Sequence, residues 1–274
     1  MHRLSRRQWL AVIAAGSAAI LSETPVAQAD PPDSGSWGGI PGLPAIPGLP
    51  PLPGLPPPEP RFPRTAIGPG TINALPGAGT TMALTIDDGA SSETVGGFID
   101  FARRTGTRLT FFVTAYYPSW TDHRDELRPL VDSGQIQLAN HTWNHPALTK
   151  LPAGAIADQL NRAKDFLWNT FGVDGAPYYR PPFGYHNDTV DQVAADCGYT
   201  VPVMWYGTLS DTSPTISEDM LLDAARQWFR AQAIVIGHAN RPTVTGIFDR
   251  LLDIVRDRNL SLVTLDDVLI PPGH

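Results

Sequence analysis

Two short clusters of polar residues combine side chains that bind a metal ion and activate water. Asp87 and Asp88 are adjacent at the end of the apolar run 82–86. His141 and His145 stand four residues apart, directly after another strand-like run. Two imidazoles and one carboxylate leave coordination positions open for water, as in catalytic metal sites. An Asp-Asp-Gly sequence alone is more typical of a turn, so the two histidines carry the inference of a metal site.

The two adjacent aspartates are expected to have different tasks. Successive residues of a strand point to opposite faces, so Asp87 and Asp88 would not face the same way. One carboxylate would bind the metal ion, and the other would act as a base beside it. The strands next to this one determine which other ionisable side chains lie near Asp87 and Asp88.

Strand and helix signals alternate from residue 65 onward, and this stretch is long enough for one well-buried core. The clearest helical stripe runs from Ile156 to Phe171, with Gly172 in the helix-ending position. Ser217 is a natural N-cap for another helix. Strand–helix alternation without hairpin signals favours a mostly parallel sheet, closed or partly closed into a barrel. The predicted strands are 82–87, 108–113, 135–139, 177–180, 199–205, 233–238 and 260–265.

Ionisable side chains follow the ends of several predicted strands. In parallel α/β barrels the carboxyl ends of the strands form one rim, where the chemistry takes place. We therefore expect these groups to converge. Two of them also have structural interpretations: His238 as a core histidine bonded to a carbonyl, and Arg180 as a surface ion pair or turn residue. The groups at the predicted rim are Asp87, Asp88, His141, Arg180, Asp211 and His238.

Four motifs occur in a fixed order along the chain. They are Thr-Ile-Asp-Asp-Gly at 85–89, His-Thr-Trp-Asn-His at 141–145, Arg-Pro-Pro-Phe-Gly at 180–184 and Ile-Gly-His at 236–238. This order resembles the polysaccharide deacetylase family, with its NodB-homology domain (carbohydrate esterase family 4). The resemblance implies a distorted (β/α)7 barrel. It also implies hydrolysis of N-acetyl, and sometimes O-acetyl, groups on amino-sugar polymers by attack of metal-bound water.

The resemblance implies a role for each residue around the expected metal ion. It assigns Asp88, His141 and His145 to a divalent ion, commonly zinc, with cobalt or manganese as alternatives. It makes Asp87 the general base that takes a proton from the attacking water. Arg180 would hold Asp87 in position and keep it ionised.

The resemblance places the proton donor on the other side of the metal. It implies His238 as general acid for the leaving amine, with Asp211 orienting and charging it. The backbone amide of Phe183 is implied as an oxyanion donor. Trp205 and Ile236 are expected to offer an apolar pocket for the acetyl methyl group.

One family motif is altered in this chain. Members usually carry a tryptophan, an aspartate and then an aspartate–tryptophan pair. Trp205 and Asp211 are kept here, but Thr208 and Thr212 stand where the first aspartate and the second tryptophan often occur. The shape of the acetyl pocket and the choice of substrate are therefore open.

The N-terminal quarter predicts export rather than a folded core. Residues 1–29 combine a basic start, an apolar stretch and a small-residue cleavage site, as signal peptides do. The paired Arg6 and Arg7 favour a twin-arginine signal over an ordinary secretory one. Residues 30–64 hold 13 of the 28 prolines and favour a disordered Pro/Gly-rich linker, either a spacer or a leader without a role. Residues 65–274 would then form the catalytic domain.

The formal net charge of −7 argues against nucleic acid as a partner. The sequence as a whole predicts an exported, metal-dependent deacetylase in a bacterial cell wall or outside the cell. Peptidoglycan is favoured over chitin as the amino-sugar polymer. We expect a monomer that meets a membrane only through an uncleaved signal. Two alternatives stay open: a deacylase of small non-sugar amides, and a catalytically inactive glycan-binding module.

Overall fold

The computed structural model describes residues 62–271. The predicted export signal (1–29) and most of the predicted linker (30–64) lie outside the described residues. The division of the chain into signal, linker and catalytic domain therefore stays a prediction. Within 62–271, no helix has the length and apolar character needed to cross a membrane.

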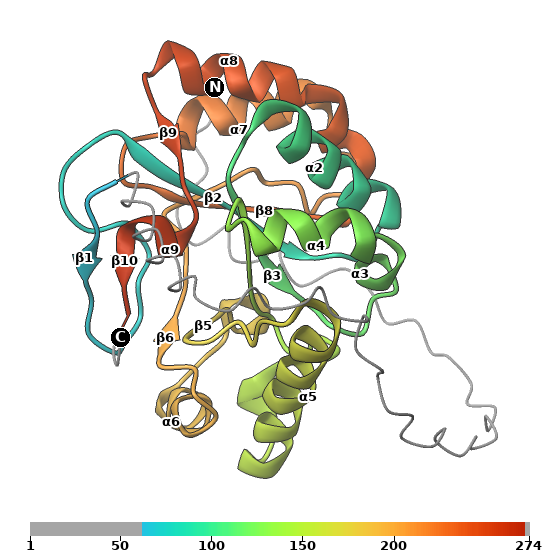
Figure 1. Ribbon diagram of the computed structural model, residues 1–274, viewed down its shortest axis with the longest axis vertical. Coiled ribbons are helices and arrows are strands. Elements are labelled where there is room, and N and C mark those ends of the chain that lie inside the picture. The colour runs from blue at the N-terminus through green and yellow to red at the C-terminus, as the bar shows by residue number, and fades with distance from the viewer. Residues whose placement is uncertain (1–61, 272–274) are drawn as a thin grey trace, which may run out of the picture. The chain divides into compact units, whose positions relative to one another are not determined.

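The centre of the fold is a curled sheet of parallel strands (Figure 1). Hydrogen-bonded neighbours follow the order β6-β5-β4-β3-β2-β8-β7, and β9 pairs with the start of β2. A separate two-stranded sheet joins β1 to β10. The strands are β1 (Thr65–Ala66), β2 (Thr81–Asp88), β3 (Leu109–Val113), β4 (Ile136–Asn140), β5 (Tyr178–Tyr179), β6 (Val201–Pro202), β7 (Gly207–Thr208), β8 (Ile234–His238), β9 (Ser261–Leu262) and β10 (Leu269–Ile270).

The connection between the two edge strands explains the curl. β6 and β7 lie at opposite edges of the sheet, yet only residues 203–206 separate them in the chain. The edges must therefore come close together. An earlier segment bridges to both sides, with Ile72 paired to Val203 and Ala74 paired to Ala233. The result is an incompletely closed barrel, which confirms the predicted distorted (β/α)7 architecture.

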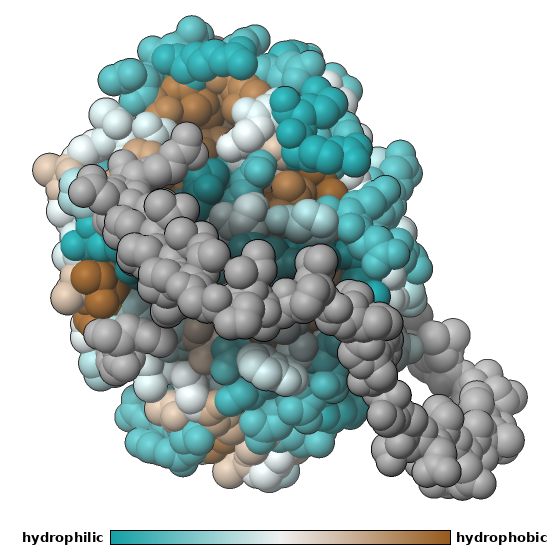
Figure 2. All heavy atoms as spheres, in the orientation of Figure 1, coloured by the Kyte–Doolittle hydropathy of each residue, from teal (hydrophilic) through white to brown (hydrophobic). Residues whose placement is uncertain are grey.

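Helices cover the outer face of this sheet (Figure 1). Their apolar sides join a large core with the outward-facing residues of β2, β3 and β4. Figure 2 shows hydrophilic side chains over much of the visible face, with apolar side chains gathered between them. The helices are α2 (Ser92–Thr105), α3 (Ser119–Asp122), α4 (Arg124–Asp132), α5 (Ala153–Phe171), α6 (Asp188–Asp196), α7 (Glu218–Trp228), α8 (Phe248–Asp257) and α9 (Leu265–Val268), with 3-10 turns η1 (Leu148–Lys150), η2 (Pro182–Gly184) and η3 (Pro242–Ile247).

Most predicted elements occur where the sequence placed them. The apolar stripe of α5 is buried, Gly172 ends that helix with a left-handed backbone (φ 72), and Ser217 caps α7. Each of the seven predicted strands is present, although 177–180, 199–205 and 260–265 shorten to the two-residue strands β5, β6 and β9. The prediction missed β7, so Asp211 follows β7 rather than the fifth predicted strand.

Candidate active site

Asp87 and His238 lie beside each other at the carboxyl ends of two neighbouring strands. In the parallel register of β2 and β8, Asp87 pairs with His238. The alternation along β2 sends Leu84 and Ile86 outward into the helix-covered core. Asp87 therefore points inward, where its carboxylate meets the Arg180 side chain. The strand period alone thus brings a carboxylate and an imidazole to one rim of the barrel.

Asp88 turns back toward the same site as Asp87. Its backbone is left-handed (φ 73), which ends the regular strand alternation. Nε2 of His141 lies 3.5 Å from Oδ2 of Asp87 and 3.5 Å from Oδ1 of Asp88. The expectation that the two carboxylates face opposite ways is therefore wrong. Non-glycine residues with this backbone cost conformational energy and cluster at functional sites.

Gly89 and Trp120 hold this turn in place. The indole Nε1 of Trp120 donates to the carbonyl oxygen of Asp88 at 3.1 Å. Ser119 Oγ donates to the carbonyl oxygen of Gly89 at 2.5 Å. Gly89 has φ +106, and a Cβ built there would lie 2.5 Å from two ring atoms of Trp120. Only glycine allows the ring to approach the backbone so closely.

Gly89→Ala is expected to lower the free energy of unfolding by about 2–6 kcal/mol, because overpacking and the unfavourable backbone each cost roughly 1–3 kcal/mol. Denaturant unfolding measures this loss. Gly70→Ala is the matched control: its φ of +126 is also restrictive for alanine, but no atom lies within 4 Å of the built Cβ. Equal losses in the two variants would contradict a specific role for the Trp120 contact.

Three potential metal ligands converge beside Asp87. His141 and His145 come from the loop after β4, in which Thr142 and His145 have left-handed backbones (φ 73 and 62). One ligand atom each from Asp88, His141 and His145 lies within 4.8 Å of the other two. Nε2 of His145 is 3.4 Å from Oδ1 of Asp88. Two ligands at about 2.1 Å from a tetrahedral zinc ion are about 3.4 Å apart, so this spacing fits zinc.

The tautomer of His141 and the pKa values of His145 and Asp88 also suit a divalent ion. Nδ1 of His141 lies 2.7 Å from the carbonyl oxygen of Arg180, which can only accept, so Nδ1 carries the proton and Nε2 is free to bind. Burial and the nearby His141 lower the pKa of His145 to about 4, which keeps that ring neutral at neutral pH. Burial alone would raise the pKa of Asp88, but the surrounding imidazoles hold it below its ordinary value. Neutral imidazoles and an ionised carboxylate are the forms that bind metal.

Arg180 is a fully buried cation that fixes Asp87. Its Nη1 donates to Oδ1 of Asp87 at 2.5 Å and to Oγ1 of Thr85 at 3.0 Å. Its Nε donates to the carbonyl oxygen of Val203 at 2.8 Å, and the guanidinium lies 4.0 Å from the ring centroid of Phe112. Burial lowers the pKa of Arg180, while the Asp87 carboxylate opposes that shift. The surface ion pair and the plain turn residue considered from the sequence are both excluded.

His238 and Asp211 form a second hydrogen-bonded pair. Oδ1 of Asp211 is 2.7 Å from Nδ1 of His238, and Oδ2 accepts from the His238 backbone amide at 2.7 Å. Burial would lower the pKa of His238, but the charge and hydrogen bond of Asp211 outweigh it and raise the pKa to about 9. Thr208 Oγ1 accepts from the amide of Ser210, whose left-handed backbone (φ 59) precedes Asp211. The altered family motif therefore still supports the turn that delivers Asp211.

The turn at 181–184 places the Phe183 ring beside His145. The amides of Gly184 and Tyr185 close this turn by donating to the carbonyl groups of Pro181 and Pro182. Phe183 has a left-handed backbone (φ 60) and takes no part in that closure. Its ring centroid is 4.6 Å from that of His145, although 46% of the side chain is exposed. The role of the Phe183 backbone amide as an oxyanion donor stays a prediction.

The two predicted pocket residues lie close to the catalytic candidates. The indole of Trp205 is half-buried, and its ring centroid is 5.7 Å from the guanidinium of Arg180. Ile236 is buried on β8, two residues before His238 and therefore on the same strand face. A pocket wall formed by these two side chains stays a prediction.

Two residues at this site were missed by the sequence analysis. Thr85 bonds Arg180 and lies two residues before Asp87, so the strand period could have indicated it. Asn240 donates from Nδ2 to Oδ2 of Asp88 at 2.6 Å. Its only sequence signal is its position two residues after His238, beyond the end of the strand.

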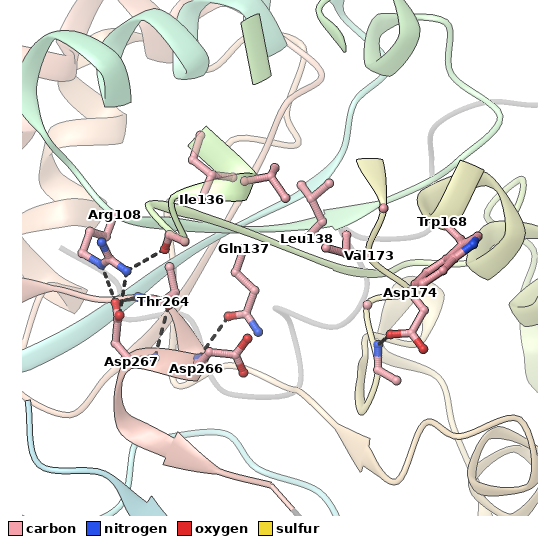
Figure 3. A pocket seen from close by; sticks show the side chains of 15 residues that line it. Arg108, Ile136, Gln137, Leu138, Trp168, Val173, Asp174, Thr264, Asp266 and Asp267 are labelled. Carbon is pink, nitrogen blue, oxygen red and sulfur yellow. Dashed lines mark hydrogen bonds and ion pairs between the residues drawn. The ribbon is translucent and has the colours of Figure 1, made fainter. Parts of the chain in front are cut away.

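A cavity of about 460 Å³ lies elsewhere in the barrel (Figure 3). Its lining includes Arg108 and Ile136, at the amino ends of β3 and β4, and Asp267 of α9, which lies beside Arg108. The Arg108 guanidinium donates twice to the Asp267 carboxylate, at 2.5 and 2.7 Å. The cavity is therefore at the opposite end of the strands from Asp87 and is separate from the candidate active site.

Comparison with known sequences agrees with the motifs. The family model described as polysaccharide deacetylase matches residues 75–202. An uncharacterized protein of Streptomyces coelicolor is 31% identical over 193 residues, which cover 68% of this chain and 72% of the relative. A chitin deacetylase of Arthroderma benhamiae is 28% identical over 70% of this chain. The peptidoglycan-N-acetylglucosamine deacetylase PgdA of Listeria monocytogenes is 26% identical over 68% of this chain.

The chain spans about half the length of that chitin deacetylase (52%) and 38% of PgdA. Among solved structures, a carbohydrate esterase family 4 pseudoenzyme from Bacillus anthracis has a TM-score of 0.64 at 20% identity, covering 73% of this chain and 69% of that one. This likeness concerns the fold alone. The sequence matches, the order of the motifs and the curled parallel barrel agree with one another, and the chain belongs to the polysaccharide deacetylase family.

Proposed function

We propose that the protein is a metal-dependent hydrolase that removes N-acetyl groups from an amino-sugar polymer, with peptidoglycan favoured over chitin. One observation carries this proposal: Asp88, His141 and His145 converge at spacings that fit a divalent ion, and Asp87 and His238 flank them. The names of the relatives from Listeria and Arthroderma support the substrate class.

The metal cluster would hold the ion with one carboxylate oxygen and two imidazole nitrogens. Zinc fits the donor set and its spacing, and cobalt or manganese can take the same ligands. When bound, the ion would lower the pKa of a water molecule and polarise the acetyl carbonyl group. His141 contributes Nε2 because its Nδ1 is held by the Arg180 carbonyl group.

Asp87 would act as the general base. Its Oδ1 is bonded to Arg180, so Oδ2 is left to accept a proton from the attacking water. Arg180 itself is anchored by Val203 and Thr85, and it would fix the direction in which Asp87 accepts the proton.

His238 would act as the general acid. As the new C–O bond forms and the amide C–N bond breaks, it would donate a proton from Nε2 to the leaving nitrogen, giving acetate and a free amine. Asp211 holds Nδ1 of the ring and favours the imidazolium form. The Phe183 amide would donate to the oxygen of the reacting carbonyl group. Trp205 and Ile236 would contact the acetyl methyl group.

The pKa of His238 predicts a pH dependence. Raised to about 9 from an ordinary 6.5, it keeps the acid protonated at neutral pH, and activity should fall as the pH rises through the alkaline range. A bound cation lowers this value, so the comparison between variants is the test. Asp211→Asn should move the alkaline limb of kcat/KM toward lower pH by about one unit or more. If folded Asp211→Asn kept its alkaline limb of kcat/KM at the same pH as the parent, the pairing of Asp211 with His238 would be contradicted.

The same shift links His238 to stability. Its folded-state pKa lies above the unfolded value, so its contribution to folding is complete below about pH 6.5 and is lost as the pH rises through about 9.

Two other functions fit parts of the chain. Thr208 and Thr212 replace residues that are usual in the altered family motif around Trp205 and Asp211. This change in the motif supports small N-acetyl amides as alternative substrates. The Bacillus anthracis relative is described as a pseudoenzyme, so the fold alone does not imply turnover. The complete set of base, acid and metal-ligand candidates in this chain favours an active enzyme over a glycan-binding module.

Acetate release from peptidoglycan, chitooligosaccharides and a simple N-acetyl amide tests the proposal. The zinc-loaded protein should release acetate from a polymer, lose this activity with a chelator and regain it when zinc is added back. Activity on the simple amide alone would favour the small-amide deacylase. Glycan binding without acetate release would favour the inactive module, and activity indifferent to the chelator would contradict metal dependence.

We also propose that the protein acts outside the cytoplasm, at the cell wall. The predicted twin-arginine-like signal and the name of the peptidoglycan-acting relative from Listeria support this location. Detection of the protein in the wall fraction, and its loss from that fraction when Arg6 and Arg7 are replaced by lysine, tests the location.

A further inference from the structure

Asn240 has a side chain that is fixed at both ends. Its Nδ2 donates to Oδ2 of Asp88 at 2.6 Å, and its Oδ1 accepts from the backbone amide of Ala90 at 3.0 Å. A backbone amide only donates and an ionised carboxylate only accepts, so the two partners leave a single orientation for the Asn240 amide. The side chain therefore spans two points of the turn that carries Asp88.

This contact gives the two carboxylate oxygens of Asp88 different partners. Oδ2 faces the Asn240 amide, while Oδ1 lies 3.5 and 3.4 Å from the Nε2 atoms of His141 and His145. Thr114 Oγ1 approaches the same Oδ1 only weakly, at 3.4 Å. The oxygen that faces the imidazoles is thus the one left for a metal ion, and the other oxygen is already bonded.

The backbone around Asn240 makes this arrangement stiff. The amide of Ala239 donates to the carbonyl oxygen of Asp87 at 2.9 Å, and the amide of Ser91 donates to the carbonyl oxygen of Ala239 at 3.0 Å. Backbone hydrogen bonds therefore join the segment after β8 to the segment at the end of β2. Asn240 lies on the same short segment as His238, so it couples the strand of the acid candidate to a metal-ligand candidate.

We propose that Asn240 is a positioning residue that presents Asp88 to the metal ion through one oxygen only. This inference rests on the proposed function in one respect, namely that Asp88, His141 and His145 bind a divalent ion. The unfavourable left-handed backbone of Asp88 needs outside support, and the Asn240 amide supplies it on the side away from the imidazoles. Residues that hold metal ligands in this way typically change metal affinity about 10–100-fold when removed.

Zinc affinity and the cobalt spectrum test this proposal on the full chain. Asn240→Ala should bind zinc about 10–100-fold more weakly than the parent in competition with a chromophoric chelator. Removal of the amide also frees Oδ2 of Asp88, so the cobalt(II)-loaded variant should show weaker visible absorption, as expected for a higher coordination number. A residue that merely stabilises the fold would not move this spectrum. Asn169→Ala, on the exposed side of α5, is the control and should change neither quantity.

The outcomes separate this inference from the proposed function. A parent protein that binds no zinc would overturn both. A parent that binds zinc, with unchanged affinity and spectrum in folded Asn240→Ala, would overturn the role of Asn240 alone. Asn240→Ser provides a second variant if the alanine protein fails to fold, because its shorter side chain cannot span Asp88 and Ala90, and the same weakening is expected.

Discussion

Asp87→Asn is expected to lower the turnover number for acetate release by about 10²–10⁴-fold while the protein still binds zinc. Asparagine has nearly the same shape as aspartate and can still accept a hydrogen bond from Arg180, but its amide cannot take a proton from water. The metal ligands proposed here are Asp88, His141 and His145, so the metal content should remain near that of the parent. Acetate release and metal analysis on the same preparation measure both quantities.

The substitution should also affect stability, because Arg180 is fully buried and Asp87 is its bonded counter-charge. Leaving a buried charge without its partner costs about 3–5 kcal/mol. Activity must therefore be measured below the unfolding transition of the variant. Asp223→Asn, an exposed carboxylate on α7, is the control and should leave turnover and stability near the parent values. Near-normal turnover in zinc-loaded Asp87→Asn would exclude Asp87 as the base.

His141→Ala is expected to abolish both zinc binding and turnover. His141 is 2% exposed, and its Nε2 lies 3.5 Å from a carboxylate oxygen of each of Asp87 and Asp88. Its removal leaves two ligands and an unfilled space between the Asp88 and Arg180 segments. We expect zinc affinity to fall by at least about 100-fold, beyond the loss expected for a residue that only supports a ligand. Metal analysis after dialysis and acetate release are the two readouts.

His123→Ala is the matched control for loss of an imidazole. His123 lies between α3 and α4, where Nε2 is 2.9 Å from the carbonyl oxygen of Ser92. This change should reduce stability modestly and leave zinc content unchanged. The comparison of His141→Ala with Asp87→Asn is the most informative one. Loss of the base should lower turnover and leave zinc bound, whereas loss of a metal ligand should remove both. If His141→Ala kept its zinc, the assignment of the ligands would be wrong.

Much of the fold could be predicted because its strands are buried and its helices are amphipathic. The stripe of α5 and its terminal Gly172 are local signals, and the structure confirms both. β7 could not be predicted, because two residues, Gly207 and Thr208, show no periodicity. It is recognised only by its pairing with β8.

The same distinction between local sequence patterns and tertiary packing applies to the active site. Asp87 and His238 end long strands, so the rim rule brought them together correctly. The direction of Asp88 was predicted wrongly, because its left-handed backbone depends on the packing of Trp120 against Gly89. Asn240 was missed because its contact with Asp88 joins segments far apart in the chain and follows no local pattern.

X-ray diffraction from zinc-soaked crystals, recorded at the zinc absorption edge, tests the metal centre most directly. We predict a single strong anomalous peak about 2.0–2.2 Å from Oδ1 of Asp88 and from Nε2 of both His141 and His145. The peak should have Asp87 and His238 on either side of it. A zinc-loaded protein whose peak lies elsewhere, or whose three ligands point apart, would contradict the account.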